Sequence, residues 1–215
     1  MLNILTERFL KPFFIMNTFT NGPAYRYHEY LLVLQPHEDL RAKIMDVKKD
    51  FQSVYQTPTL GGKAHITLAK FVVCGLMEDR IINRLRVAAM GTPPFKVSFK
   101  NFGSFPSHAI YLNTSTSIPI QYLMKELRTA GRLMKPQDAD PYFITEPYLT
   151  IARNLTPLQY EKAWYEYAYR RFTGSFVADS MLLIKRQEGE KFYQIVQRME
   201  FNNLPVKSQQ GSLFL

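Results

Sequence analysis

Two stretches of the chain, HITLAK at 65–70 and YLTIAR at 148–153, repeat one order of residue types. Each begins with a ring side chain, His65 in the first and Tyr148 in the second, and has a threonine two residues later. Because alternate residues of a β-strand point to the same side, each stretch would present a ring and a hydroxyl on one face. Imidazolium and hydroxyl groups donate hydrogen bonds to anionic oxygens, so two such strands side by side favour a phosphate site.

The hydroxyls are those of Thr67 and Thr150, and the same pattern ends in a basic residue, Lys70 or Arg153. Strict alternation would point both basic side chains away from the ring face. A phosphate-binding role for them therefore requires each strand to end or to bulge after its threonine.

With these motifs the chain resembles the 2H phosphoesterases, in particular the branch that includes the 2′-5′ RNA ligases and cyclic nucleotide phosphodiesterases. That family is marked by twin strands of the form His-x-Thr followed by an apolar residue. The first motif is intact from His65, whereas Tyr148 replaces the histidine of the second. The similarity spans roughly residues 29–201 in the order of elements, and its specific part is the two short motifs.

The resemblance implies acid–base chemistry on 2′,3′-cyclic or 2′-5′ phosphodiesters of RNA ends or nucleotides. One histidine would activate water or a ribose hydroxyl, the other would protonate the leaving oxygen, and the threonines would hold the phosphoryl oxygens. It implies neither a metal nor a cofactor. The sequence agrees, since its four histidines, at 28, 37, 65 and 108, form no ligand spacing with each other or with Cys74.

Tyrosine at position 148 changes what the site can do. Its reference pKa is about 10, so a tyrosine base near neutral pH would need about 4 kcal/mol of differential stabilisation. We therefore expect His65 to act as general base and Tyr148 as general acid or as a donor to the phosphate. Loss of one acid–base group typically lowers the rate by about 10² to 10⁴. Reduced turnover is one expectation, and the alternative is an inactive RNA- or nucleotide-binding protein on the same scaffold. An interaction protein without a phosphate ligand is a third possibility.

Hydrophobic periodicity predicts an α+β fold. Expected helices cover 37–55, 78–90, 119–133 and a segment that starts at Pro157 behind the N-cap Thr156; expected strands cover 29–36, 64–75, 94–102, 108–114, 147–154, 176–186 and 191–201. The order suggests a two-lobed, pseudo-twofold duplicated unit. Each half would contain a motif strand, helices and a final strand pair. The two antiparallel sheets would face a central cleft with the helices outside.

The chain has 215 residues, a formal net charge of +9 and a pI near 9.6. This charge favours a polyanionic partner, here an RNA end or a nucleotide phosphodiester. The lone Cys74 suggests a reducing compartment, hence the cytoplasm, and no apolar stretch predicts a membrane span. We expect residues 1–24 to form a loosely ordered extension, 25–206 a single bilobal domain and 207–215 a flexible tail, and we assume a monomer.

Overall fold

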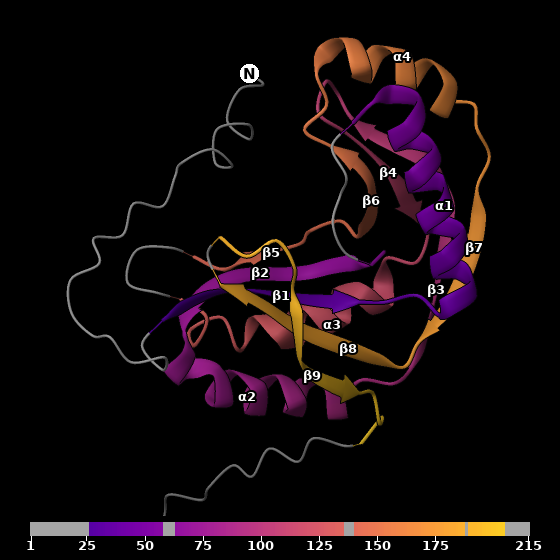
Figure 1. The fold of residues 1–215 in the computed structure, drawn as a ribbon. Helices are drawn as coiled ribbons and strands as arrows, with labels where there is room; N and C mark the ends of the chain where they lie inside the picture. Colours follow the sequence, from indigo (N-terminus) through magenta and orange to yellow (C-terminus); the bar gives the residue numbers. More distant parts are fainter. Residues whose placement is uncertain (1–25, 58–62, 136–139, 188, 205–215) are drawn as a thin grey trace, which may run out of the picture.

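The computed structural model describes residues 26–57, 63–135, 140–187 and 189–204 (Figure 1). The predicted extension and tail lie outside these residues, and the domain boundaries remain a prediction. The elements are β1 (Tyr27–Leu34), α1 (Glu38–Tyr55), β2 (Ile66–Cys74), η3 (Gly75–Met77), α2 (Glu78–Met90), β3 (Phe95–Phe105), β4 (Ala109–Thr114), α3 (Ile118–Arg128), β5 (Tyr142–Phe143), β6 (Tyr148–Arg153), α4 (Pro157–Tyr167), β7 (Thr173–Ala178), β8 (Ser180–Gln187) and β9 (Gln194–Glu200).

The strands form two antiparallel sheets, which confirms the predicted α+β class. The first sheet has the order β5-β2-β1-β8-β9 and the second has the order β6-β4-β3-β7, so each contains one motif strand. Helices α2 and α3 pack together beside the first sheet, whereas α1 and α4 pack on the second (Figure 1). The motif strands β2 and β6 approach one another where the two sheets meet.

Alternation along β1 explains the two faces of the first sheet. Tyr30, Leu32 and Leu34 belong to the main hydrophobic core. The residues between them, Leu31 and Val33, join a small separate cluster on the opposite face. We call this opposite face, which also carries Thr67, the site face of the first sheet.

The order of elements along the chain agrees with the predicted duplication. The first half runs β1–α1–β2–α2 and ends in the paired strands β3 and β4, and the second half runs α3–β5–β6–α4–β7 and ends in the paired strands β8 and β9. The two halves are not separate in space, because β4 pairs with β6 and β3 with β7 in the second sheet, and β8 pairs with β1 in the first. Each sheet therefore contains strands from both halves of the chain.

Two of the predicted elements, one strand and one helix, differ clearly in extent from those of the structure. The strand expected at 176–186 is two strands, because the chain passes from the second sheet into the first at Asp179. Phe176 and Ala178 are buried before this point and Met181 after it, so a continuous apolar run concealed the change of sheet. Helix α3 ends at Arg128 rather than 133, where single-turn hydrogen bonds such as Thr129 N–H to the Glu126 carbonyl replace the helical ones.

The predicted start of α4 is confirmed. Thr156 accepts a hydrogen bond from the backbone N–H of Gln159, whose side chain accepts one from the Thr156 N–H, and Pro157 occupies the first turn. The helix buries Tyr167 and leaves Tyr165 83% exposed.

Candidate active site

The first motif strand bulges directly after its threonine. Thr67 and Ala69 of β2 face consecutive residues of β1, so Leu68 is an extra residue in the pairing. Leu68 and Ala69 are both buried, and Lys70 then returns to the same face as Thr67.

The second motif strand bulges at the equivalent position. Thr150 and Ala152 of β6 face consecutive residues of β4, and Ile151 is the extra residue. Ile151 and Ala152 are buried, and Arg153 follows as an exposed residue on the face of Thr150. The condition for bringing Lys70 and Arg153 onto the threonine face is therefore met in both strands.

His65 lies immediately before β2, half-buried, with its Nδ1 2.7 Å from the carbonyl oxygen of Lys63. A carbonyl only accepts, so Nδ1 carries the proton and donates, and Nε2 keeps its lone pair. Burial lowers the pKa of His65, and the positive charges of Lys48 and Arg153 lower it further, against the opposing effect of the hydrogen bond to Lys63. The imidazole is thus held neutral, the form that a general base requires.

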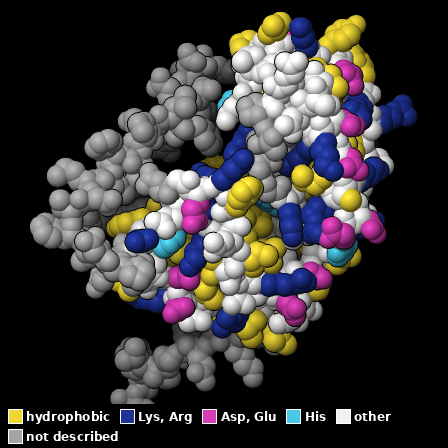
Figure 2. Space-filling model, viewed as in Figure 1, with side chains coloured by type: hydrophobic (Ala, Val, Ile, Leu, Met, Phe, Trp, Pro, Cys, Tyr) yellow, Lys and Arg dark blue, Asp and Glu magenta, His cyan; other side chains and the backbone are white. Residues whose placement is uncertain are grey.

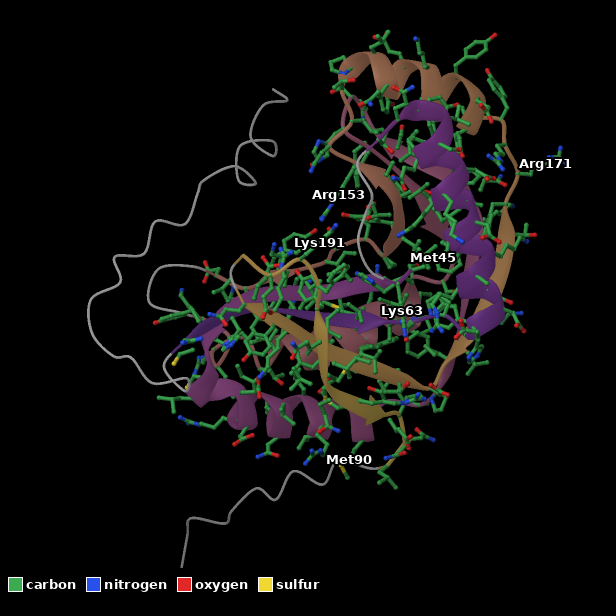
Figure 3. The ribbon with its side chains drawn as sticks, viewed as in Figure 1. Met45, Lys63, Met90, Arg153, Arg171 and Lys191 are labelled. Atoms are coloured by element: carbon green, nitrogen blue, oxygen red, sulfur yellow. The ribbon has the colours of Figure 1, made fainter. Side chains whose placement is uncertain are left out.

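Arg153 links the two motifs electrostatically. Its charge acts on His65, on Tyr148 and on Tyr193, which belongs to the segment between β8 and β9. Figure 3 shows Arg153 at the end of β6, above the first sheet in this view. Among the described residues it forms no ion pair.

Lys48 of α1, which the sequence analysis did not single out, acts electrostatically on His65. Burial lowers the pKa of Lys48 to about 8, with a further contribution from the charge of Arg153. It follows Val47 and lies one turn after Ile44, both buried, so it flanks the apolar stripe of the helix. A lysine at the edge of a buried stripe was the available signal, whereas the neighbouring Lys49 is exposed and paired with Asp46 at 3.3 Å.

Tyr148 lies in an aromatic cluster. Its ring centroid is 5.0 Å from that of Tyr111 and 5.2 Å from that of Phe105, and its hydroxyl shares a hydrogen bond with that of Tyr142. The pKa of Tyr148 is raised to about 12. Burial is the largest cause, and the neighbouring Tyr142 and Tyr111 add to it. The phenol therefore stays protonated near neutral pH and can donate a hydrogen bond but cannot act as a base.

Lys70 forms an ion pair with a carboxylate that it shares with Arg186. Its ammonium lies 2.7 Å from Glu29, which also pairs with Arg186 at 2.8 Å and accepts a hydrogen bond from Tyr193. Burial alone would raise the pKa of Glu29, but the hydrogen bonds from Lys70 and Tyr193 and the charges of Lys70 and Arg186 lower it. The two equivalent basic residues thus have unequal surroundings.

Other surface features do not mark a competing site. Lys and Arg side chains are spread over the face shown in Figure 2, with Asp and Glu between them. The net charge of the chain therefore does not by itself indicate where an anion would bind. Two surface cavities, of about 550 and 370 Å³, lie beside α3 and are lined by no motif residue. Within the described part of the chain, no helix is long and apolar enough to span a membrane.

The chain belongs to the 2′-5′ RNA ligase superfamily, whose family model matches residues 35–190. A search of curated proteins found no match. Among solved structures, the chain is similar to a phosphoesterase (TM-score 0.62, 16% identity, covering 81% of this chain and 98% of that one). It is also similar to Escherichia coli LigT complexed with ATP (TM-score 0.60, 17% identity, covering 82% of this chain and 99% of that one). A third similar structure is the Thermus thermophilus protein TT0787 (TM-score 0.60, 15% identity, covering 81% of this chain and 98% of that one). At these identities the likeness shows the fold alone. Further LigT structures hold phosphate and 3′-AMP.

Proposed function

We propose that the chain acts on 2′,3′-cyclic or 2′-5′ phosphodiesters of RNA ends or nucleotides, with turnover reduced by the tyrosine at position 148. One observation carries the proposal: both motif strands bulge at the same position, so that each sets a threonine and a basic residue on one face. The charge of Arg153 then reaches both His65 and Tyr148. The ligands of the E. coli LigT structures, phosphate and nucleotides, are of the same chemical class.

The proposed hydrolysis of a cyclic phosphodiester begins at His65. Its Nε2 takes a proton from water as the water oxygen attacks phosphorus, and the bond between phosphorus and one ribose oxygen breaks. The leaving oxygen takes a proton from Tyr148. His65 then releases its proton to solvent and Tyr148 takes one up, so that both groups return to their starting states. Thr67 and Thr150 donate hydrogen bonds to the phosphoryl oxygens, and Arg153 offsets the charge that develops on them.

A second candidate is a protein that binds such ends without turning them over. The setting of Tyr148 favours it, because the hydroxyl already bonds to Tyr142 and the ring packs against Tyr111 and Phe105. With a pKa raised to about 12, the phenol releases its proton reluctantly.

Incubation with 2′,3′-cyclic nucleotides and with a 2′-5′ linked dinucleotide separates the two candidates. Turnover that is abolished in His65→Ala and retained in His108→Ala, an exposed histidine with no role in the motifs, supports the enzyme. Binding without turnover supports the second candidate. Neither binding nor turnover of these compounds would contradict both.

A further inference from the structure

Three basic side chains from separate elements act on one another beside the site face. Lys48 comes from α1, Arg153 from the end of β6, and His65 from the segment before β2. The charge of Arg153 acts on both Lys48 and His65, and the charge of Lys48 acts on His65. Helix α1 packs against β6, so the two elements that carry Lys48 and Arg153 are in contact, and the charge of Arg153 is felt at Lys48.

Among the described residues, no carboxylate forms an ion pair with Lys48 or Arg153. The acidic residues of α1 whose partners are known pair elsewhere: Glu38 with Arg41, Asp46 with Lys49, and Asp50 with Arg170. Lys48 is largely withdrawn from water, so the charge of the exposed Arg153 repels it more strongly than it would repel a cation in bulk water. The neutral His65 does nothing to offset that repulsion. Such an arrangement is stabilised when an anion binds between the cations.

We propose that Lys48 is a ligand-binding residue that, together with Arg153, holds the phosphoryl group, and that the pair favours phosphoryl groups with two negative charges. The inference rests on the proposed function and deepens it, because Lys48 belongs to neither motif. In a site that has lost its second histidine, Lys48 supplies the positive charge from another element.

The ligand class follows from counting charges. A phosphodiester carries one negative charge, whereas a terminal phosphomonoester carries nearly two at neutral pH. The phosphoryl group of a diester gains a second charge only as water attacks it. Two cations and two threonine hydroxyls therefore bind a monoester, or the transition state for attack of water on a diester, better than a diester in its ground state.

The test measures binding of inorganic phosphate and of 3′-AMP by calorimetry to wild type, Lys48→Gln, Lys48→Arg and Lys49→Gln. Lys49 is the matched control, since it is the next residue of the same helix and lies in solvent. We expect Lys48→Gln to weaken both ligands by about ten- to hundred-fold, the contribution of one charged hydrogen bond, and Lys48→Arg to restore most of it. Lys49→Gln should change Kd by about two-fold or less.

Thermal unfolding without ligand provides a second measurement, in which a binding residue and a packing residue should change Tm differently. Removing one of two repelling cations should leave the Tm of Lys48→Gln equal to or above that of wild type, whereas a residue needed only for packing would lower it. The combination of weaker phosphate binding and an undiminished Tm supports the proposal. Equal binding by Lys48→Gln and Lys49→Gln, or no phosphate binding by wild type, overturns it.

Turnover of a 2′,3′-cyclic nucleotide distinguishes this failure from that of the proposed function. If Lys48→Gln binds phosphate as wild type does while His65-dependent turnover persists, the role of Lys48 is wrong and the proposed function stands. If wild type binds phosphate through Lys48 but hydrolyses nothing, the role of Lys48 stands and the enzymatic proposal fails.

Discussion

Lys70 and Arg153 occupy equivalent positions in the two motif strands, but only Lys70 has a carboxylate partner in the described structure. Its ammonium lies 2.7 Å from Glu29, whereas the charge of Arg153 acts on His65 and Tyr148. The approximate symmetry of the backbone thus does not extend to its charges. Among the described residues, the motif cation without an ion-pair partner therefore lies on the second motif strand.

This asymmetry predicts unequal effects of two matched substitutions. Arg153→Gln should weaken 3′-AMP binding by about ten- to hundred-fold, because it removes a charged donor that faces the ligand. Lys70→Gln should weaken it by only about two- to three-fold, because that lysine is already held in an ion pair with Glu29. Calorimetric titration of both variants checks the order. A larger effect at Lys70 would place the anion at the other strand.

Restoring the missing histidine should raise turnover. Tyr148→His replaces a phenol, whose pKa is raised to about 12, with a group that exchanges protons near neutral pH. We expect kcat for a 2′,3′-cyclic nucleotide to rise by about ten-fold or more. Tyr148→Phe, which keeps the ring and removes the hydroxyl, should lower it if the phenol donates the proton. Unchanged rates in both variants would mean that this position takes no part in the reaction.

The lowered pKa of His65 predicts how the site responds to acid. Because the folded protein favours the neutral imidazole, His65 should remain an effective base below its ordinary pKa of about 6.5. In Lys48→Gln the loss of a nearby positive charge should raise the pKa of His65 toward that ordinary value. NMR titration of the imidazole measures this without requiring turnover. Lys49→Gln serves as the control, and an equal shift there would assign the effect to general surface charge.

Glu29 should contribute stability that depends on pH. Glu29→Gln leaves Lys70 and Arg186 without their counter-charge, so we expect it to lower the free energy of unfolding by about 1–3 kcal/mol at pH 7. The pKa of Glu29 is lowered in the folded state, so this contribution is present above pH 4.5 and is lost as pH falls through the folded pKa. Urea unfolding of wild type and variant at pH 7 and pH 3 should show the difference shrinking in acid. Asp46→Asn, at an exposed pair, should show little difference at either pH.

Local patterns in the sequence predicted most of the elements because each depends on near neighbours. Apolar runs or alternation predicted strands such as 29–36 and 94–102. The spacing of Ile44, Val47 and Phe51 predicted α1, and Thr156 with Pro157 predicted the start of α4. The crossing at Asp179 was missed, since a strand that changes sheet keeps its apolar alternation and differs only in its partners.

The sequence predicted the two motif strands, and the roles of their side chains remain predictions. The twin strands indicated which residues could meet, and the need for a bulge was clear, but the bulges themselves depend on pairing with β1 and β4. Lys48 was missed because its neighbours come from a distant part of the chain. The ion pair between Lys70 and Glu29 could not be predicted for the same reason, because Glu29 belongs to another strand.

Because each sheet contains strands from both halves of the chain, neither half should unfold independently of the other. A cut in the turn between β3 and β4 would give two fragments, each holding strands of both sheets and a complete set of neither. Neither fragment alone could shield the apolar faces of its strands, so each should remain unfolded until it meets the other. The intact chain should correspondingly lose both sheets in one cooperative transition.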